Sequence, residues 1–289
     1  MKRILSMVTA GTLLISIFFS VIFSSISNIF IKDTPIIEAP LPEQPNLPEQ
    51  PIPEIQFPPI TPILPEQPII PVPEEKAKDV YVKAKVNGLN IRTQPKTSAS
   101  SLGYIDKNDM LSYKETKGGW HVVEYKNKTA YISAGNSYTI LFDIEKSENE
   151  KIESVINEGY KLLGYPYVYG ATRYHNGNGK LLSGFNKTKY DCSSLMQYIF
   201  YHGAGINLNL TTRTQIKQGK HVSKSDIQRG DLIFFTNSDR YYNSGIERVG
   251  HVALYLGDNY ILHTASDYAV IEEISSKRWS YYIETRRMI

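Results

Sequence analysis

A proline-rich stretch at residues 33–77 limits what this chain can fold into, because proline fixes φ and lacks the N–H donor that helices and sheets use. The sequence Leu-Pro-Glu-Gln-Pro occurs in it three times, at residues 41–45, 47–51 and 64–68. The stretch is predicted to be an extended, polyproline-type spacer, which at ~3.1 Å per residue would span on the order of 130 Å. We expect a stalk; a ligand for a proline-binding domain is the alternative.

The first 32 residues combine a positively charged start with a long uncharged run. Lys2 and Arg3 precede residues 4–31, which carry no charge and exceed the ~20 apolar residues that cross a bilayer. Positive charges ahead of such a run predict a cytoplasmic N-terminus and an exported remainder. The small-residue site Ser25-Ile26-Ser27 is not of the Ala-x-Ala type, so a retained membrane anchor is favoured over a cleaved signal peptide. The rest of the chain is therefore expected outside the cytoplasm, secreted if the segment is cleaved.

Residues 78–146 have the pattern of short strands and turns, with Asn87-Gly88 as a strong turn signal. The Leu-Asn-x-Arg element at 89–92 and the Gly-Trp-x-x-Val element at 119–123 resemble those of bacterial SH3-type barrels. The resemblance implies a small all-β domain that contacts wall components or a neighbouring catalytic domain. The alternative is a spacer that has Trp120 in its core.

The one cysteine of the chain, Cys192, follows a residue that is well suited to begin a helix. Asp191 is a good N-cap, and apolar residues then recur at helical spacing, at positions 195, 196, 199 and 200. Cys192 is therefore expected in the first helical turn, where backbone N–H groups favour a negative charge. A thiol attacks carbonyl carbon as thiolate, so such a position suits a nucleophile. Taken alone, an unpaired cysteine is more often a small buried residue.

Two histidines follow the cysteine and are predicted to lie on neighbouring strands. The run that starts at His251 alternates, a Gly-Asp-Asn turn signal follows at 257–259, and the chain then returns through His263. If all three turn residues form the loop, Leu256 faces Tyr260 and the histidines are diagonal neighbours on one face. A two-residue loop would place them on opposite faces. A lone histidine is more often structural, but a capped cysteine with two facing histidines indicates a Cys/His site.

Five elements in the second half of the chain resemble, in order, those of the NlpC/p-sixty cysteine peptidases. They are Gly-Tyr-Pro-Tyr-Val-Tyr-Gly at 164–170, Asp-Cys-Ser at 191–193, Arg-Gly-Asp-Leu-Ile-Phe-Phe at 229–235, Gly-His-Val at 250–252 and Leu-His at 262–263. Members of that family are papain-like enzymes that cut peptidoglycan stem peptides. The resemblance implies three catalytic residues: Cys192 as nucleophile, His251 as general base and acid, and His263 as the group that orients His251.

The same resemblance implies that Tyr167 lies beside the thiol. Asp191 and Ser193 remain ambiguous, because they either cap the helix or contact a stem-peptide amine, as in some family members. The chain departs from the family pattern at Ser194 and Ala171, where glycine is usual. Residues 172–190 form a longer Gly/Asn/Lys-rich segment than the family usually places before the cysteine, and we expect a surface loop near the cleft.

Residues 147–289 are thus expected to form an α+β, papain-like domain that follows the SH3-type barrel. Its first helix should begin at a capping box, residues 147–150, and end at Gly164. All candidate reactive groups lie between Tyr167 and His263, in a segment that has enough apolar residues for a core of its own. Asp231 is expected to be a turn residue rather than a catalytic acid.

The predicted function is that of an exported cell-wall hydrolase that cleaves an amide in stem peptides, with the D-γ-glutamyl–diamino acid bond as the one the resemblance implies. The alternatives are another thiol amidase or acyltransferase of the same broad fold, and a non-catalytic wall-binding or secretion-assembly protein. A net charge of +3 is too small to indicate nucleic acid. The other histidines show no metal-ligand spacing, so neither a metal nor another cofactor is expected.

Overall fold

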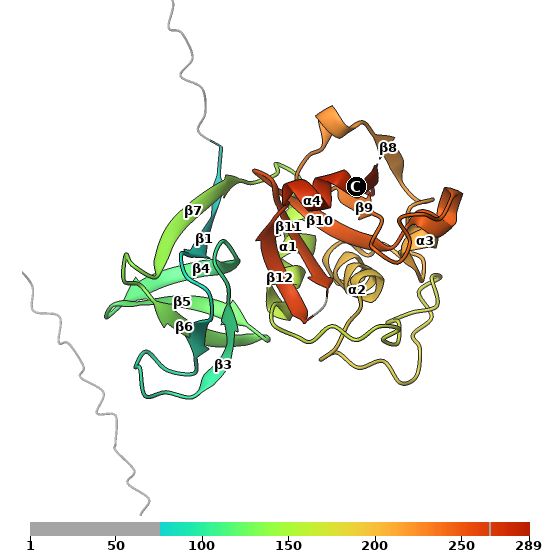
Figure 1. Ribbon diagram of the computed structural model, residues 1–289. Helices are drawn as coiled ribbons and strands as arrows, with labels where there is room; N and C mark the ends of the chain where they lie inside the picture. Colours follow the sequence, from blue (N-terminus) through green and yellow to red (C-terminus); the bar gives the residue numbers. More distant parts are fainter. Residues whose placement is uncertain (1–75, 266) are drawn as a thin grey trace, which may run out of the picture. The chain divides into compact units, whose positions relative to one another are not determined.

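The computed structural model describes residues 76–265 and 267–289 (Figure 1). The predicted membrane segment and residues 33–75 of the proline-rich stretch lie outside the described residues. The described residues belong to one compact unit. No helix in this part of the chain is long and apolar enough to cross a membrane.

Strands alone make up the first part of the described chain. They are β1 (Lys78–Ala84), β2 (Leu89–Arg92), β3 (Ser101–Ile105), β4 (Met110–Lys117), β5 (Trp120–Tyr125), β6 (Lys128–Ser133) and β7 (Thr139–Glu145). Strand β1 pairs with β4 and β7, and β2 to β6 pair in the order β3-β2-β6-β5-β4, all antiparallel. The predicted strands and the turn at Asn87-Gly88 are confirmed. Trp120 is only half-buried, so it is not the core residue that the spacer interpretation required.

Helices and an antiparallel sheet make up the second part. Its helices are α1 (Glu150–Leu162), α2 (Cys192–Ala204), α3 (Thr212–Gln215), η1 (Lys224–Asp226), η2 (Gly245–Arg248) and α4 (Ser276–Ser280). Its strands are β8 (Lys220–Val222), β9 (Leu232–Phe235), β10 (His251–Gly257), β11 (Tyr260–Ala265), β12 (Tyr268–Glu273) and β13 (Tyr282–Arg287), in the order β12-β11-β10-β9-β13-β8. Helix α2 packs on α1 and on β10 and β11 (Figure 1). The expected α+β class is confirmed for the described residues.

Helix α1 begins two residues later than expected. Its N-cap is Asn149, whose Oδ1 accepts from the Lys151 N–H at 3.0 Å, so the capping box predicted at residues 147–150 is wrong. Glu153 instead reaches back to the Ser147 N–H, at 2.8 Å. Gly164 does follow the helix end, with φ of +85°, where a Cβ would lie 2.1 Å from the Tyr125 ring. This glycine therefore lets the end of α1 pack against β5.

The hairpin that carries the two histidines also differs from its expected form. The observed cross-strand pairs are Leu254 with Leu262, Tyr255 with Ile261 and Gly257 with Tyr260. The loop is only Asp258-Asn259, both with positive φ, so the predicted three-residue loop with Leu256 opposite Tyr260 is wrong. A β-bulge at Leu256 adds one residue to β10. The bulge offsets the shift that a two-residue loop alone would cause, and both histidines remain on one face.

A polar cluster joins the barrel to the α+β part. Arg229 is 8% exposed, and its guanidinium donates to both carboxylate oxygens of Glu153 in α1 and to Oδ2 of Asp79 in β1. Tyr81 and Tyr160 complete the cluster, with their hydroxyl oxygens 2.5 Å apart. Nearby, β4 pairs with β12 through Met110 and Ile271. The barrel therefore shares buried contacts with the part that carries Cys192.

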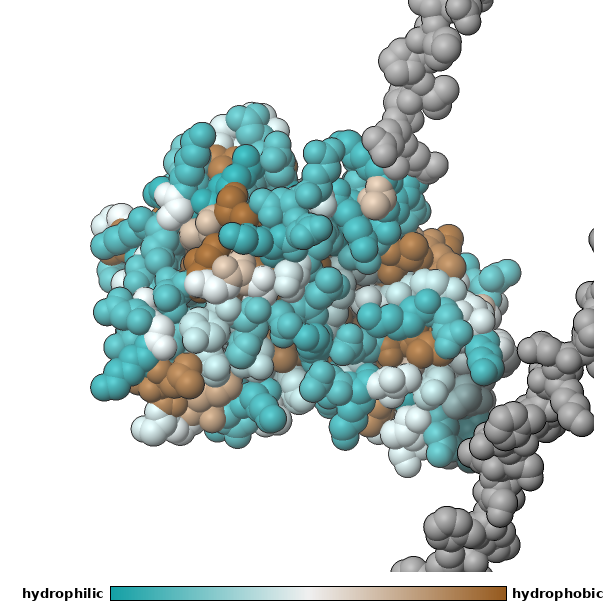
Figure 2. All heavy atoms as spheres, turned by 180° about the vertical axis from the view of Figure 1, so that it is seen from behind, coloured by the Kyte–Doolittle hydropathy of each residue, from teal (hydrophilic) through white to brown (hydrophobic). Residues whose placement is uncertain are grey.

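The outer surface is mainly polar. On the face shown in Figure 2, hydrophobic residues form small separate patches rather than one continuous surface. Such scattered patches are ordinary for a folded domain. Candidate sites on the described residues are therefore sought in cavities and in clusters of reactive side chains.

Candidate active site

Cys192 is the first residue of α2 and is 7% exposed. Asp191 caps the helix, because its Oδ1 accepts from the Ser194 N–H at 2.8 Å while Ser194 Oγ accepts from the Asp191 N–H at 2.9 Å. The predicted N-cap and the first-turn position of the cysteine are confirmed. The Cys192 sulfur is hydrogen-bonded by the backbone N–H groups of Val252 and Ser193, which places it against β10, next to His251.

Burial, rather than the helix N-terminus, dominates the ionisation of this thiol. Burial and the Asp191 carboxylate raise the pKa of Cys192 to about 12, and the two backbone N–H groups and Arg173 oppose this only in part. Burial, with smaller contributions from His263 and Arg278, holds the pKa of His251 well below its usual value. In the substrate-free protein the pair is therefore a neutral thiol beside a neutral imidazole. The thiol with a lowered pKa that the sequence suggested is not found here.

The two histidines form a hydrogen-bonded pair across β10 and β11. His251 Nε2 and His263 Nδ1 lie 2.9 Å apart, and the rings meet edge to face at 79°. Both side chains are buried, at 7% and 1% exposure. The face-sharing predicted from the sequence is confirmed by this contact. Burial lowers the pKa of His263 as well, although Glu272 opposes the shift.

Glu272 extends the pair and was missed by the sequence analysis. Its Oε1 lies 3.0 Å from His263 Nε2, at an angle less linear than an ordinary hydrogen bond, and 2.7 Å from the Arg278 guanidinium. Burial alone would raise the pKa of Glu272, but His263 and Arg278 lower it to about 2. The side chain comes from β12, where an acidic residue two positions beyond the partner of His263 shares its face. That alternation was the available signal.

Tyr167 lies close to both Cys192 and His251. Its pKa is raised to about 12 by burial and by the nearby Cys192. Tyr167 and His251 together line a cavity of about 470 Å³, whose other walls come from the segment after β9 and from the start of α4. Cys192, His251, His263 and Tyr167 are thus brought together by one helix start, two strands and one loop.

Asp191 and Ser193 are instead turned toward a neighbouring arginine. Arg173 Nη1 donates to Asp191 Oδ2 at 2.7 Å, and Arg173 Nη2 donates to Ser193 Oγ at 3.1 Å. Ser193 Oγ in turn donates to Asp191 Oδ1 at 3.1 Å, and both residues are at most 5% exposed. Their polar atoms therefore serve the helix cap and the arginine rather than an open surface.

Arg173 was also missed, and it comes from the long segment ahead of the cysteine. Its Nε donates to the Leu210 carbonyl at 2.5 Å, and the next residue, Tyr174, packs edge to face on Phe185, Tyr198 and Tyr201. The segment is thus fixed to α2 by aromatic contacts. The expectation that it lies near the cleft is confirmed at Arg173.

Asp231 has a structural role, and the described residues form no candidate metal site. Asp231 accepts from the Gln228 N–H at 2.8 Å and forms two bonds with Arg287, at 2.8 Å each, as a turn residue would. Among the described residues, no group of three or more His, Cys, Asp or Glu side chains is placed to hold a metal ion.

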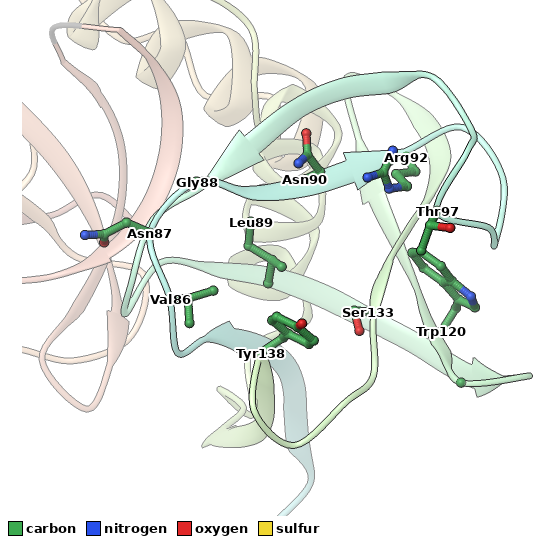
Figure 3. A pocket seen from close by; sticks show the side chains of 11 residues that line it. Val86, Asn87, Gly88, Leu89, Asn90, Arg92, Thr97, Trp120, Ser133 and Tyr138 are labelled. Atoms are coloured by element: carbon green, nitrogen blue, oxygen red, sulfur yellow. The ribbon is translucent and has the colours of Figure 1, made fainter.

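The barrel has a cavity of its own, of about 540 Å³. Figure 3 shows Trp120 beside Thr97 at one end of it and Tyr138 near Val86 and Leu89 at the other, with Ser133 between the two aromatic rings. Tyr138 is 49% exposed. Two accessible aromatic rings with polar neighbours make a surface that can bind a ligand.

Comparison with known proteins agrees with the motifs. Residues 164–288 match the NlpC/P60 family model, and residues 87–138 match that of a bacterial SH3 domain. The chain is 31% identical to the peptidoglycan DL-endopeptidase CwlO of Bacillus licheniformis over 47% of this chain and 27% of that protein. It is 34% identical to a γ-D-glutamyl-L-lysine dipeptidyl-peptidase of Bacillus cereus over 39% of this chain and 28% of the relative. The chain thus spans about a quarter of the length of these two curated relatives.

Among solved structures, one of an NLP/P60 family protein from Staphylococcus aureus is similar to this chain. The two are 32% identical, with 50% of this chain and 43% of the other covered and a TM-score of 0.39.

Proposed function

We propose, from the NlpC/P60 domain and the bacterial SH3 domain that this chain contains, that it is a cell-wall hydrolase which cleaves an amide bond in peptidoglycan stem peptides. The observation that carries the proposal is the series Cys192, His251, His263 and Glu272, with the thiol at a helix start and the histidines 2.9 Å apart. The name of the Bacillus cereus relative, a γ-D-glutamyl-L-lysine dipeptidyl-peptidase, supports the bond between D-γ-glutamate and a diamino acid, and that of the Bacillus licheniformis relative supports a DL-endopeptidase.

The tautomers of the two histidines follow from Glu272. Its carboxylate is ionised at neutral pH and lies 3.0 Å from His263 Nε2, so its negative charge favours the tautomer that carries the proton on Nε2. His263 Nδ1 then accepts from His251 Nε2–H, which leaves Nδ1 of His251 unprotonated. A base with its second nitrogen held in this way is oriented for proton transfer.

The reaction proceeds through an acyl-enzyme. The Cys192 sulfur attacks the amide carbonyl carbon while His251 Nδ1 takes the thiol proton. The Cys192 backbone N–H, a first-turn amide, donates to the developing oxyanion. His251 then protonates the leaving amine, the C–N bond of the tetrahedral intermediate breaks, and the acyl portion remains on Cys192 as a thioester. Water, deprotonated by His251, hydrolyses the thioester and restores the free thiol. Because the resting pair is neutral, the thiol ionises only as the attack takes place.

The other parts of the chain determine where in the cell envelope this reaction takes place. We propose that residues 1–32 direct export and that residues 4–31 hold the protein in the membrane, with residues 33–77 as a stalk. Residues 78–146 are the SH3-type domain, and the cavity between Trp120 and Tyr138 supports a contact with wall components. Residues 147–289 are the peptidase domain. The protein would then act in the wall, at the extracytoplasmic face.

Mass spectrometry of purified peptidoglycan and of defined muropeptides treated with the protein tests this function. The expected products are two fragments separated between D-γ-glutamate and the diamino acid, formed by the wild type and not by Cys192→Ala. Cleavage between the sugar and L-alanine would indicate an amidase, and peptide exchange without net hydrolysis an acyltransferase. Binding to walls without any product would indicate a non-catalytic protein. Each of these three results would replace the proposed activity.

A further inference from the structure

The cavity that contains His251 and Tyr167 has a marked charge. Its volume is about 470 Å³, and Lys277 and Arg278 line it where β12 leads into α4. Its other lining side chains in the described part of the chain are neutral, among them Asn237, and none is acidic. A pocket with this lining favours an anionic group.

The two cations differ in how far they are already paired. Arg278 donates to Glu272 Oε1 at 2.7 Å and lies over the Phe235 ring, so its charge is largely used within the protein. Lys277 is exposed and has no ion-pair partner within residues 76–265 and 267–289. Asp239 follows the lining residue Ser238 in the sequence but does not itself line the cavity. The ammonium group of Lys277 is therefore available to a bound molecule.

The position of the cavity shows which part of a substrate it takes. A general acid must lie within hydrogen-bond reach of the leaving amine, so the leaving portion of the peptide extends from His251. The Cys192 sulfur, which holds the acyl portion, lies instead against the Val252 N–H and the start of α2. The leaving portion of the proposed substrate begins with the diamino acid.

We infer that this cavity is the subsite for the diamino acid and that Lys277 selects one whose side chain ends in a carboxylate, as in diaminopimelate, over one that ends in an ammonium alone, as in lysine. The inference rests on the proposed function. A side-chain carboxylate accepts a charge-assisted hydrogen bond from Lys277, whereas a lysine ammonium group meets a like charge. Because Lys277 is exposed and solvent screens it, we expect a preference of about tenfold rather than a complete exclusion.

Three synthetic peptides separate the possible sources of a carboxylate. Each has the form L-Ala-γ-D-Glu-X with the α-carboxyl group of X amidated, and X is meso-diaminopimelate, its side-chain amide, or L-lysine. The value of kcat/KM is measured for the wild type, Lys277→Gln and Lys277→Glu. Lys96→Gln, at an exposed barrel lysine, is the matched control. Thermal unfolding of each variant confirms that it is folded.

The wild type and Lys96→Gln should prefer the free diaminopimelate peptide over its amide and over the lysine peptide by about tenfold. Lys277→Gln should reduce that preference to about one, mainly through KM, and Lys277→Glu should shift it toward lysine. An unchanged preference in Lys277→Gln would overturn the inference while leaving the proposed function intact. A fourth peptide, the diaminopimelate peptide amidated at the D-glutamate α-carboxylate, tests the acyl portion. If that amidation lowers kcat/KM of the wild type but not of Lys277→Gln, the acyl portion lies in this cavity and the inference is overturned. If the wild type cleaves none of the peptides, the proposed function itself fails.

Discussion

Arg229 and Arg173 each bind a carboxylate, but in different surroundings. Arg229 is 8% exposed, and its donors reach Glu153, Asp79, Tyr81 at 3.1 Å and the Leu256 carbonyl at 2.8 Å. Arg173 is half-buried at the cleft, with Asp191 and Ser193 as its side-chain partners. The first arginine joins two parts of the chain, and the second stands beside the reacting sulfur.

The difference lies in what each charge acts upon. Around Arg229, two carboxylates and two tyrosine hydroxyls depend on one guanidinium, so the arginine mainly affects stability. Around Arg173, the Asp191 carboxylate raises the pKa of Cys192 and the guanidinium lowers it. This second arginine therefore affects the ionisation of the thiol. The Arg229 ion pairs thus hold the barrel and the α+β part together, whereas the Arg173 ion pair affects the charge around Cys192.

Substitutions in the proposed catalytic pair should have the largest effect on activity and a much smaller effect on stability. Cys192→Ala and His251→Ala should each lower kcat by at least ~10⁴-fold, because nucleophile and base act as one unit. Thermal unfolding of Cys192→Ala should stay close to that of the wild type, because only the sulfur is removed. His251→Ala also removes the buried hydrogen bond to His263, so it should lower stability by about 1–3 kcal/mol and still fold. His263→Asn should retain measurable activity. Comparable peptide hydrolysis by a folded Cys192→Ala protein would falsify the thiol mechanism.

The second expected effect is a steep pH dependence of thiol alkylation. Since the pKa of Cys192 is raised to about 12, its thiolate fraction should rise about tenfold per pH unit below that value. The rate of iodoacetamide inactivation should then increase ~10³-fold between pH 6 and pH 9. His251→Ala should change this profile little, because a neutral imidazole does not stabilise a thiolate.

A preformed thiolate–imidazolium pair would behave differently in the same assay. Inactivation would reach a plateau between about pH 5 and pH 8, and His251→Ala would abolish that plateau. Observation of such a plateau would show that the His251 imidazolium, rather than burial, controls the ionisation of the thiol.

The sequence was sufficient for the parts of the site that depend on local patterns. Asp191 as N-cap, Cys192 in the first turn and an antiparallel pair of strands for the histidines all follow from spacing within ten to fifteen residues. The bulge at Leu256 was not predictable, because a bulge is chosen by packing on both faces of the sheet. The predicted face-sharing was right although its predicted loop was wrong.

The missed residues are those whose role depends on distant segments. Glu272 acts through a strand paired with β11, and Arg173 acts from a loop held by aromatic rings of α2. The raised pKa of Cys192 results from burial, and the elements that pack on α2 include β10, some sixty residues away in the sequence. The cluster at Arg229 likewise joins residues up to 150 positions apart. A fragment of residues 147–289 would lack Asp79 and Tyr81, two of the partners of Arg229. The cluster therefore argues against the expectation that this fragment folds alone.

The third prediction compares the two arginines directly. Arg229→Met should reduce the free energy of unfolding by about 3–5 kcal/mol, because it leaves Asp79 and Glu153 buried without a counter-charge. Arg173→Met should reduce it by less, about 1 kcal/mol, yet slow alkylation of Cys192 at a given pH. Denaturant unfolding and iodoacetamide kinetics on both variants measure the two effects. A larger loss of stability in Arg173→Met than in Arg229→Met would reverse the comparison.

The smallest expected effect belongs to Glu272, which touches neither the thiol nor the substrate in the proposed mechanism. A glutamine at this position can donate as well as accept, so it no longer holds the His263 proton on Nε2. His263 can then donate from Nδ1 to His251 Nε2, which moves the His251 proton to the nitrogen that must act as base. Misplacing a catalytic group by ~1 Å costs about 100-fold, so Glu272→Gln should lower kcat/KM by about 10- to 100-fold. Glu273→Gln, at the exposed neighbour on the other face of β12, is the control and should leave kcat/KM unchanged. Equal losses in both variants would mean that the strand, rather than the charge beside His263, supports the site.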